Sequence, residues 1–222
     1  MGVRTYYWGP QAWIFIHTCS EYLDRLKNPR ITALFWFILP RTIPCIHCRT
    51  SCKSFIQMMA TSCMTQTRFS YLLHQEVNLK LFEQDIHSET DTLTVVQKWV
   101  GHQPQYSKMH TFAADSNVFR KAMIDFFYYV VCDYELSRHT QINELFMLTA
   151  TVLKGTTTGD TLYKTLQRVG PLKKSITLQE RIQYIYDINS ILSESHGDAA
   201  PLSPISRRDV CEHAIVGCVL KY

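Results

Sequence analysis

Two cysteines separated by two residues, Cys45 and Cys48, form the motif of this chain best suited to chemistry. Such a pair can close a small disulfide, remain a dithiol or supply half of a metal site. The residues that follow, 50–60, have the pattern of a helix, with Phe55 and Ile56 available for its buried side. At a helix start, unpaired backbone N–H groups and the helix dipole stabilise a thiolate. The pair therefore favours thiol–disulfide exchange, although its spacing alone leaves a metal site open.

The composition excludes several other classes of protein. The chain has 222 residues, of which 46% are hydrophobic, enough for one large or two small cores. Its 23 basic and 19 acidic residues give a net charge of only +4, without a long Lys/Arg run, so we expect no nucleic-acid partner. The longest apolar run, 31–39, is too short to span a bilayer, and the aromatic N-terminus does not resemble a signal peptide. We therefore expect a soluble protein made in the cytosol.

The other cysteines give no sign of a disulfide framework. The chain has eight cysteines, too few for a disulfide-dense secreted scaffold of this length. In the absence of an export signal, we expect most of them to be buried thiols that pack as small hydrophobic groups. Those outside the central pair are Cys19, Cys52, Cys63, Cys132, Cys211 and Cys218.

Hydrophobic periodicity predicts an all-α protein, with no convincing strand pattern in the first half. The turn-rich segment 101–115 suggests a boundary between a domain over 1–102 and a second helical domain over 103–222. The spacing Thr177…Glu180 predicts a capping box, and no internal repeat of fixed period is present. The expected helices cover 8–27, 31–39, 50–62, 66–82, 90–100, 117–137, 141–154, 161–169, 177–193 and 207–220.

Three separated segments, Trp8–His17, Pro44–Cys48 and His74–Leu81, combine Trp, His, Cys and Asn at fixed spacings. Their residues and their order resemble the motifs of the Erv/ALR family of FAD-linked sulfhydryl oxidases. The first helix of that family usually has the pattern W-G-P-x-x-W-x-x-x-H, its redox motif is P-C-x-x-C, and its flavin helix carries H-N-x-V-N-x-K/R-L. The resemblance covers roughly residues 8–100. The matching segments here are Trp8-Gly9-Pro10-x-x-Trp13-x-x-x-His17, Pro44-Cys45-x-x-Cys48 and His74-Gln75-Glu76-Val77-Asn78-Leu79-Lys80-Leu81.

This resemblance implies a fold and a set of site residues. The family fold is an orthogonal four-helix bundle plus a fifth helix, usually as a homodimer, with FAD at the mouth of the bundle. Cys48 would face the flavin and Cys45 would exchange with substrate. A basic–Trp pair, Lys98 and Trp99, would close over the adenine end. The other positions that would contact FAD are Gly9, Trp13, His17, Tyr22, His74, Asn78 and Lys80.

The resemblance also implies an activity and a source. Electrons from protein dithiol substrates would pass through the Cys45–Cys48 disulfide to FAD and then to molecular oxygen, giving hydrogen peroxide. An oxidase module close to Met1 followed by a long helical extension is similar to oxidases of large DNA viruses, which implies the host cytoplasm or the virion. We expect no shuttle disulfide from Cys211 and Cys218, because seven residues on one helix separate them by about 10 Å.

Departures from the family pattern keep two other interpretations open. Gln75 replaces the first Asn of the flavin motif, and Ser51 replaces a His common three residues after the second redox cysteine. One alternative is a zinc or iron–sulfur site built from Cys45, Cys48, Cys52 and Cys63, although zinc sites generally present two close pairs on turns, so no metal ligand is predicted. The other is a helical interaction protein with an inactive oxidase-like domain.

Overall fold

The computed structural model describes residues 5–59, 64–88, 111–174 and 176–198, and every regular element in these ranges is a helix. The predicted all-α class is therefore confirmed for this part of the chain. The expected helices over 90–100 and 207–220 and the boundary at 102/103 lie outside the described residues. The first half contains α1 (Thr5–Leu26), α2 (Pro29–Thr42), α3 (Ile46–Met59) and α4 (Gln66–Ser88).

Local sequence signals explain where α2 begins and why it ends later than expected. The Asn28 side chain accepts hydrogen bonds from the N–H groups of Arg30 and Ile31, and Pro29 occupies the first helical position, where its missing N–H costs nothing. The helix continues through Pro40 to Thr42 rather than ending at Leu39. A proline in the last turn removes one hydrogen bond, and burial of its ring compensates for that loss.

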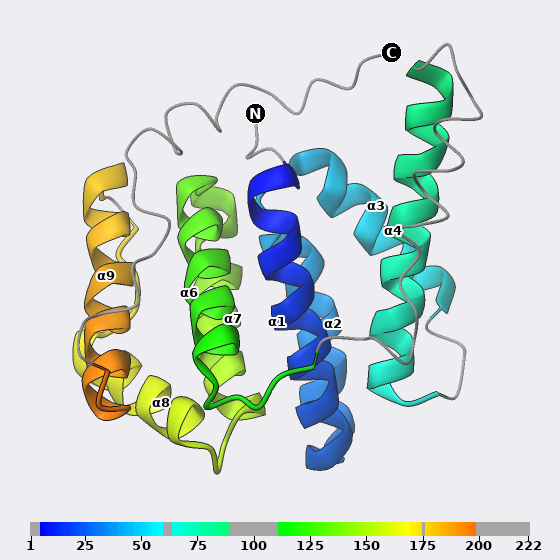
Figure 1. Cartoon of the computed structure of the whole chain (residues 1–222). Helices are drawn as coiled ribbons and strands as arrows, with labels where there is room; N and C mark the ends of the chain where they lie inside the picture. Colours follow the sequence, from blue (N-terminus) through cyan, green and yellow to red (C-terminus); the bar gives the residue numbers. More distant parts are fainter. Residues whose placement is uncertain (1–4, 60–63, 89–110, 175, 199–222) are drawn as a thin grey trace.

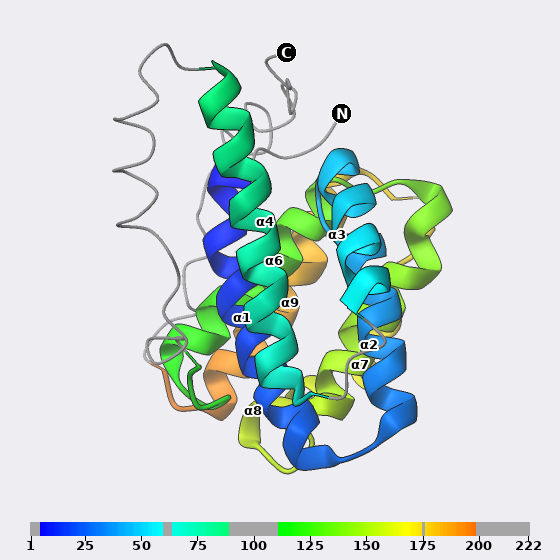
Figure 2. The same ribbon diagram turned by 90° about the vertical axis from the view of Figure 1, so that its right-hand side faces the viewer.

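The second half contains α6 (Asn117–Cys132), α7 (His139–Val152), α8 (Thr157–Val169) and α9 (Leu178–Ser195), with a short 3₁₀ helix at Leu136–Arg138. The predicted capping box is confirmed: the Thr177 hydroxyl accepts from the Glu180 N–H, and the Glu180 carboxylate accepts from the Thr177 N–H. In Figure 1, α9, α6, α1 and α4 stand side by side, with α7 and α2 behind α6 and α1. Figure 2 shows α3 above α2, beside α4.

The two halves repeat one packing arrangement. In the first half α4 packs against α1 and α3, and α3 packs against α2; in the second, α9 packs against α6 and α8, and α8 packs against α7. Between the halves, α1 packs against α6 and α2 against α7, so corresponding helices meet. The sequence does not reveal this repeat, because it lies in helix order rather than in a residue pattern of fixed period.

One hydrophobic core joins both halves. The Phe15 ring of α1 lies 5.1 Å from the Phe126 ring and 5.9 Å from the Phe127 ring of α6, and it also contacts Phe35 of α2. All four side chains are fully buried. Phe126 and Phe127 are therefore part of the core. No helix of the described residues combines the length and apolar character needed to cross a membrane.

Candidate functional site

The first half of α1, the start of α3 and the middle of α4 enclose a cavity that is lined by both cysteines of the pair. Its volume is about 220 Å³, and its walls are mostly apolar. The three motif segments, which lie far apart in the sequence, meet at this one place. The motif residues that line it are Trp8, Gly9 and Trp13 of α1, Cys45 and Cys48 at the start of α3, and Val77, Lys80 and Leu81 of α4.

Cys45 is the N-cap of α3. Its carbonyl accepts the first helical hydrogen bond from the Arg49 N–H, and its Sγ accepts from the Cys48 N–H at 3.3 Å. The helix therefore begins at Ile46, four residues earlier than the sequence pattern indicated. A sulfur in this position receives an N–H bond and faces the positive end of the helix dipole, and both stabilise a thiolate.

The two sulfurs differ in exposure. Cys45 is completely buried, whereas Cys48 is partly exposed and its Sγ lies 3.6 Å from the Thr5 hydroxyl at the start of α1. Ile46 and His47, between them, are exposed. An incoming thiolate therefore reaches Cys48 more readily than Cys45 in this conformation, and attack at Cys45 requires movement of the turn.

Arg49 connects the cysteine turn to the second half. Its guanidinium donates to the Ile43 carbonyl at 3.0 Å, to the Asp133 carboxylate at 2.7 Å and to the Glu135 carboxylate at 2.9 Å. Arg138 donates to the same Asp133 oxygen at 2.9 Å. Burial raises the pKa of Asp133, although Arg138 and Arg49 oppose this effect. The cluster holds the turn from outside the cavity, since Arg49 does not line it.

Trp13, His17 and His74 form a stacked group beside the cavity. The indole of Trp13 lies 3.9 Å from the His74 ring at an interplanar angle of 11°. His17 links the two helices, since its Nε2 lies 3.0 Å from His74 Nδ1 and its Nδ1 lies 3.0 Å from the Ser70 hydroxyl. Burial, with a smaller contribution from His17, lowers the pKa of His74 to about 3, so this imidazole is neutral near pH 7.

Lys80 brings a positive charge to the cavity wall. Its ammonium donates to the Ser51 hydroxyl, which in turn donates to the His47 carbonyl at 3.1 Å. The Lys80 ammonium is thus linked to the cysteine turn through the Ser51 side chain. An ammonium in this position can stabilise a thiolate or bind an anionic group of a ligand. Sequence reasoning recorded Ser51 only as a departure from the family pattern and missed this bridge.

Not every predicted site residue lies at the cavity. Tyr22 points toward the second half, where its hydroxyl accepts from the Ala114 N–H at 3.1 Å. Asn78 lies on α4 one turn after His74, between Val77 and Leu79, and does not line the cavity. Lys98 and Trp99 lie outside the described residues. The structure therefore brings together Gly9, Trp13, Cys45, Cys48 and Lys80, with His17 and His74 behind Trp13.

The remaining cysteines behave differently from one another. Cys52 lines the cavity one turn after Cys48, and burial raises its pKa to about 12; burial also raises the pKa of Cys19. Both are inert packing thiols, as expected. Cys132, expected to be a thiol, is disulfide-bonded, because the position of a buried cysteine in sequence does not reveal a partner. No group of three potential ligands gathers within the described ranges, and Cys63 lies outside them.

Comparison of the chain with protein-family models, with curated proteins and with solved structures finds no match in any of the three.

Proposed function

We propose that this chain is an FAD-linked thiol oxidase that forms disulfides in protein dithiols and uses molecular oxygen as the electron acceptor. The observation that carries the proposal is the meeting of three distant motifs around one cavity. Gly9 and Trp13 come from one motif, the cysteine pair from the second and Lys80 from the third. The histidines of the first and third motifs, His17 and His74, lie beside this cavity, stacked with Trp13.

The cavity has features that suit an isoalloxazine ring. It is lined largely by apolar groups, and the aromatic side chain of Trp13 is one of them. Gly9 also lines it, without a side chain that would take up space. Lys80 would meet an anionic part of the cofactor. A bound FAD would accept two electrons from the cysteine pair and pass them to oxygen, giving hydrogen peroxide.

The protein's own residues would carry the thiol exchange. After the turn moves to expose the buried Cys45, a substrate thiolate attacks the Cys45–Cys48 disulfide at Cys45, forms a mixed disulfide and releases Cys48 as a thiolate. A second substrate thiol then attacks the mixed disulfide, so the substrate leaves with one disulfide and the pair is reduced. In total the substrate loses two electrons and two protons, and oxygen takes up both. The N-cap position of Cys45 and the nearby ammonium of Lys80 stabilise the thiolates that this exchange generates.

The viral source, the compartment and the homodimer implied by the family resemblance are part of the same proposal. A viral source, and with it the host cytoplasm or virion, follows only from the resemblance of the motif order and the helical extension. A homodimer would have to use a face other than the α1–α6 contact, because α6 of the same chain already covers that side of α1.

The decisive experiment is a flavin spectrum and an oxygen-consumption assay on the purified full-length chain with a dithiol substrate. We expect a yellow protein that consumes oxygen and yields hydrogen peroxide. Cys45→Ala and Cys48→Ala should retain the colour and lose turnover, because the cysteines exchange electrons without anchoring the cofactor. The matched control is Cys52→Ala, which removes a third thiol from the same cavity wall and should retain turnover. A colourless protein, or turnover that survives Cys48→Ala, would refute the proposal.

A further inference from the structure

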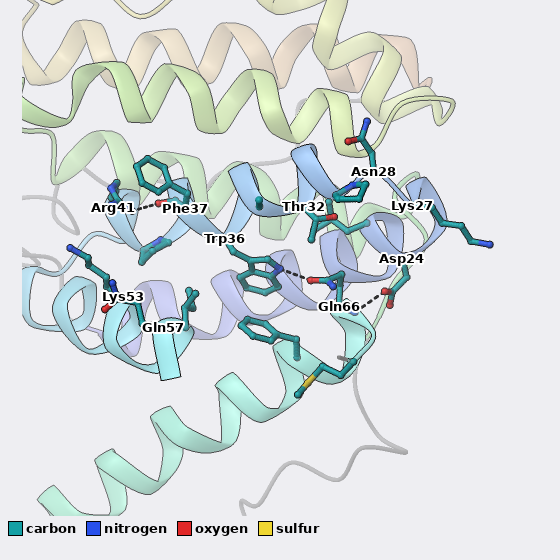
Figure 3. Close-up of a pocket in the computed structure, with 17 residues that line it drawn as sticks. Asp24, Lys27, Asn28, Thr32, Trp36, Phe37, Arg41, Lys53, Gln57 and Gln66 are labelled. Atoms are coloured by element: carbon teal, nitrogen blue, oxygen red, sulfur yellow. Dashed lines mark hydrogen bonds between the residues drawn. The ribbon is translucent and has the colours of Figure 1, made fainter. Parts of the chain in front are cut away.

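A second and larger hollow, of about 740 Å³, shares no lining residue with the sulfur cavity. It is a groove between α2, α3 and the start of α4, with the end of α1 beside it (Figure 3). The groove exists because α3 packs against both α2 and α4 and holds them apart. The oxidase chemistry proposed above makes no use of it.

The floor of the groove is apolar and fixed in place. The Trp36 ring of α2 lies 4.7 Å from the Phe69 ring of α4, and the Trp36 indole N–H donates to the Gln66 side-chain carbonyl at 2.7 Å. Phe37 lies at the rim with 52% of its surface exposed. The Arg41 guanidinium lies over this ring, 3.5 Å from its centroid, and donates to the Phe37 carbonyl. An occupant that covers the exposed part of the Phe37 ring gains free energy by burying apolar surface.

The charges around the groove have one sign. Lys27 lies at one end, and Arg41 and Lys53 lie at the other (Figure 3). Among the residues that the structure describes, no carboxylate lies within ion-pair distance of these three cations. Asp24 is the acidic residue of the lining. Its carboxylate caps the start of α4, where it accepts hydrogen bonds from the Gln66 and Thr67 N–H groups and from the Thr67 hydroxyl.

The groove continues toward the cysteine turn. A further hollow of about 320 Å³ shares Pro40, Arg41 and Lys53 with it and extends to Arg49 and Arg138. Together the two hollows make an elongated channel that has separated cations along its length. A compact small molecule would contact one end of this channel only, whereas an extended polypeptide segment could follow all of it.

We infer that this groove is a docking site for an acidic polypeptide segment of a partner protein, with large apolar side chains between its carboxylates. The apolar side chains would lie over Trp36 and Phe37, and the carboxylates would pair with the cations at the two ends. Nucleic acid fits less well, because Trp36 and Phe69 of the floor are buried and the Arg41 guanidinium covers one face of the exposed Phe37 ring, which leaves little flat surface for base stacking.

The test uses the full-length chain and a short synthetic peptide with Asp and Glu at both ends and Phe and Leu in the middle. Fluorescence anisotropy of the labelled peptide should show saturable binding that weakens as salt rises. The triple variant Lys27→Glu/Arg41→Glu/Lys53→Glu should lose at least about tenfold in affinity, because each reversal turns an attraction into a repulsion. Phe37→Ala, a change at an exposed ring, should also weaken binding.

The matched control reverses three exposed cations outside the groove, Lys154→Glu/Lys164→Glu/Arg168→Glu, with the same change in net charge. It should change the affinity less than about twofold. Equal losses in the two triple variants, or no saturable binding by the wild type, would overturn the inference. It would also fail if a peptide with Ser in place of Phe and Leu bound equally well. Tighter binding of single-stranded DNA or of vesicles containing phosphatidylserine, with displacement of the peptide, would assign the surface to that class instead.

Discussion

The cluster around Asp133 allows the dependence of the cysteine turn on the second half to be tested by mutation. Arg49 and Asp133 lie 84 residues apart in the sequence and 2.7 Å apart in space. The exposed fractions of their side chains are 11% and 8%, whereas that of Glu135 is 46%. These differences predict unequal costs for removing the members of the cluster.

Asp133→Ala should be the most damaging change. It leaves two guanidinium groups, those of Arg49 and Arg138, without their shared buried acceptor. Breaking a buried ion pair from one side costs about 3–5 kcal/mol, and we expect the lower end because Glu135 remains near both cations. For a chain of this size the lower figure corresponds to a fall in Tm of about 6–12 °C.

Arg49→Met should cost less, because Asp133 keeps Arg138 as a partner at 2.9 Å. The loss of one charged hydrogen bond predicts about 1.5–3 kcal/mol. Glu135→Gln should cost less than about 1 kcal/mol, since its pair is half exposed. Urea unfolding of each variant measures these costs, and Glu144→Ala, an exposed acid of α7, serves as the control.

A double-mutant cycle then distinguishes a direct bridge from two independent losses. Asp133→Ala combined with Arg49→Met should be less destabilising than the sum of the two single changes, because both remove the same contact. Oxygen consumption, if the oxidase proposal holds, should fall in Arg49→Met while the flavin colour is retained. Additive costs, or an Asp133→Ala variant as stable as Glu144→Ala, would refute the idea that this pair holds the turn.

Three further outcomes are expected. The pKa of His74 is about 3 in the folded chain and near 6.5 in the unfolded chain. The free energy of unfolding should therefore decrease by up to about 1.4 kcal/mol for each pH unit below 6.5. Urea titrations at several pH values should show that His74→Gln flattens this dependence. Lys80→Met should weaken FAD retention about tenfold in equilibrium dialysis, because it removes the ammonium from the cavity wall, whereas Ser51→Ala should have a smaller effect. Gly159→Ala should lower Tm in a thermal melt by several degrees or more, because an added Cβ would lie 2.1 Å from the Leu153 carbonyl oxygen.

The helices were largely predictable because their signals are local. The capping box at Thr177 is a reliable pattern, and hydrophobic spacing located α4 and α9. The start of α3 was misplaced because cysteine is not among the usual N-cap residues, and the end of α2 because Pro40 is tolerated in a last turn. Motif spacing predicted that Gly9, Trp13, Cys45, Cys48 and Lys80 lie near one another, but Tyr22 and Asn78, predicted in the same way, do not line the cavity.

The contacts between distant residues were not predictable from the sequence. Nothing distinguishes Asp133 from the other acidic residues as the partner of Arg49, because an ion pair across 84 positions leaves no local pattern. Tyr22 lies on α1 beyond the cavity, and only the packed structure shows that its hydroxyl is used by the second half. Likewise the bridge through Ser51 depends on how α4 crosses α3, which neither helix specifies alone.

The second half therefore packs into the same hydrophobic core as the first half. α1 has two buried sides: one faces α4 and the sulfur cavity, and the other carries Phe15 into the aromatic core of α6. A first half without α6 would expose that ring and leave Arg49 without Asp133. The helix that forms a wall of the cavity is thus held in place from the side opposite the sulfurs.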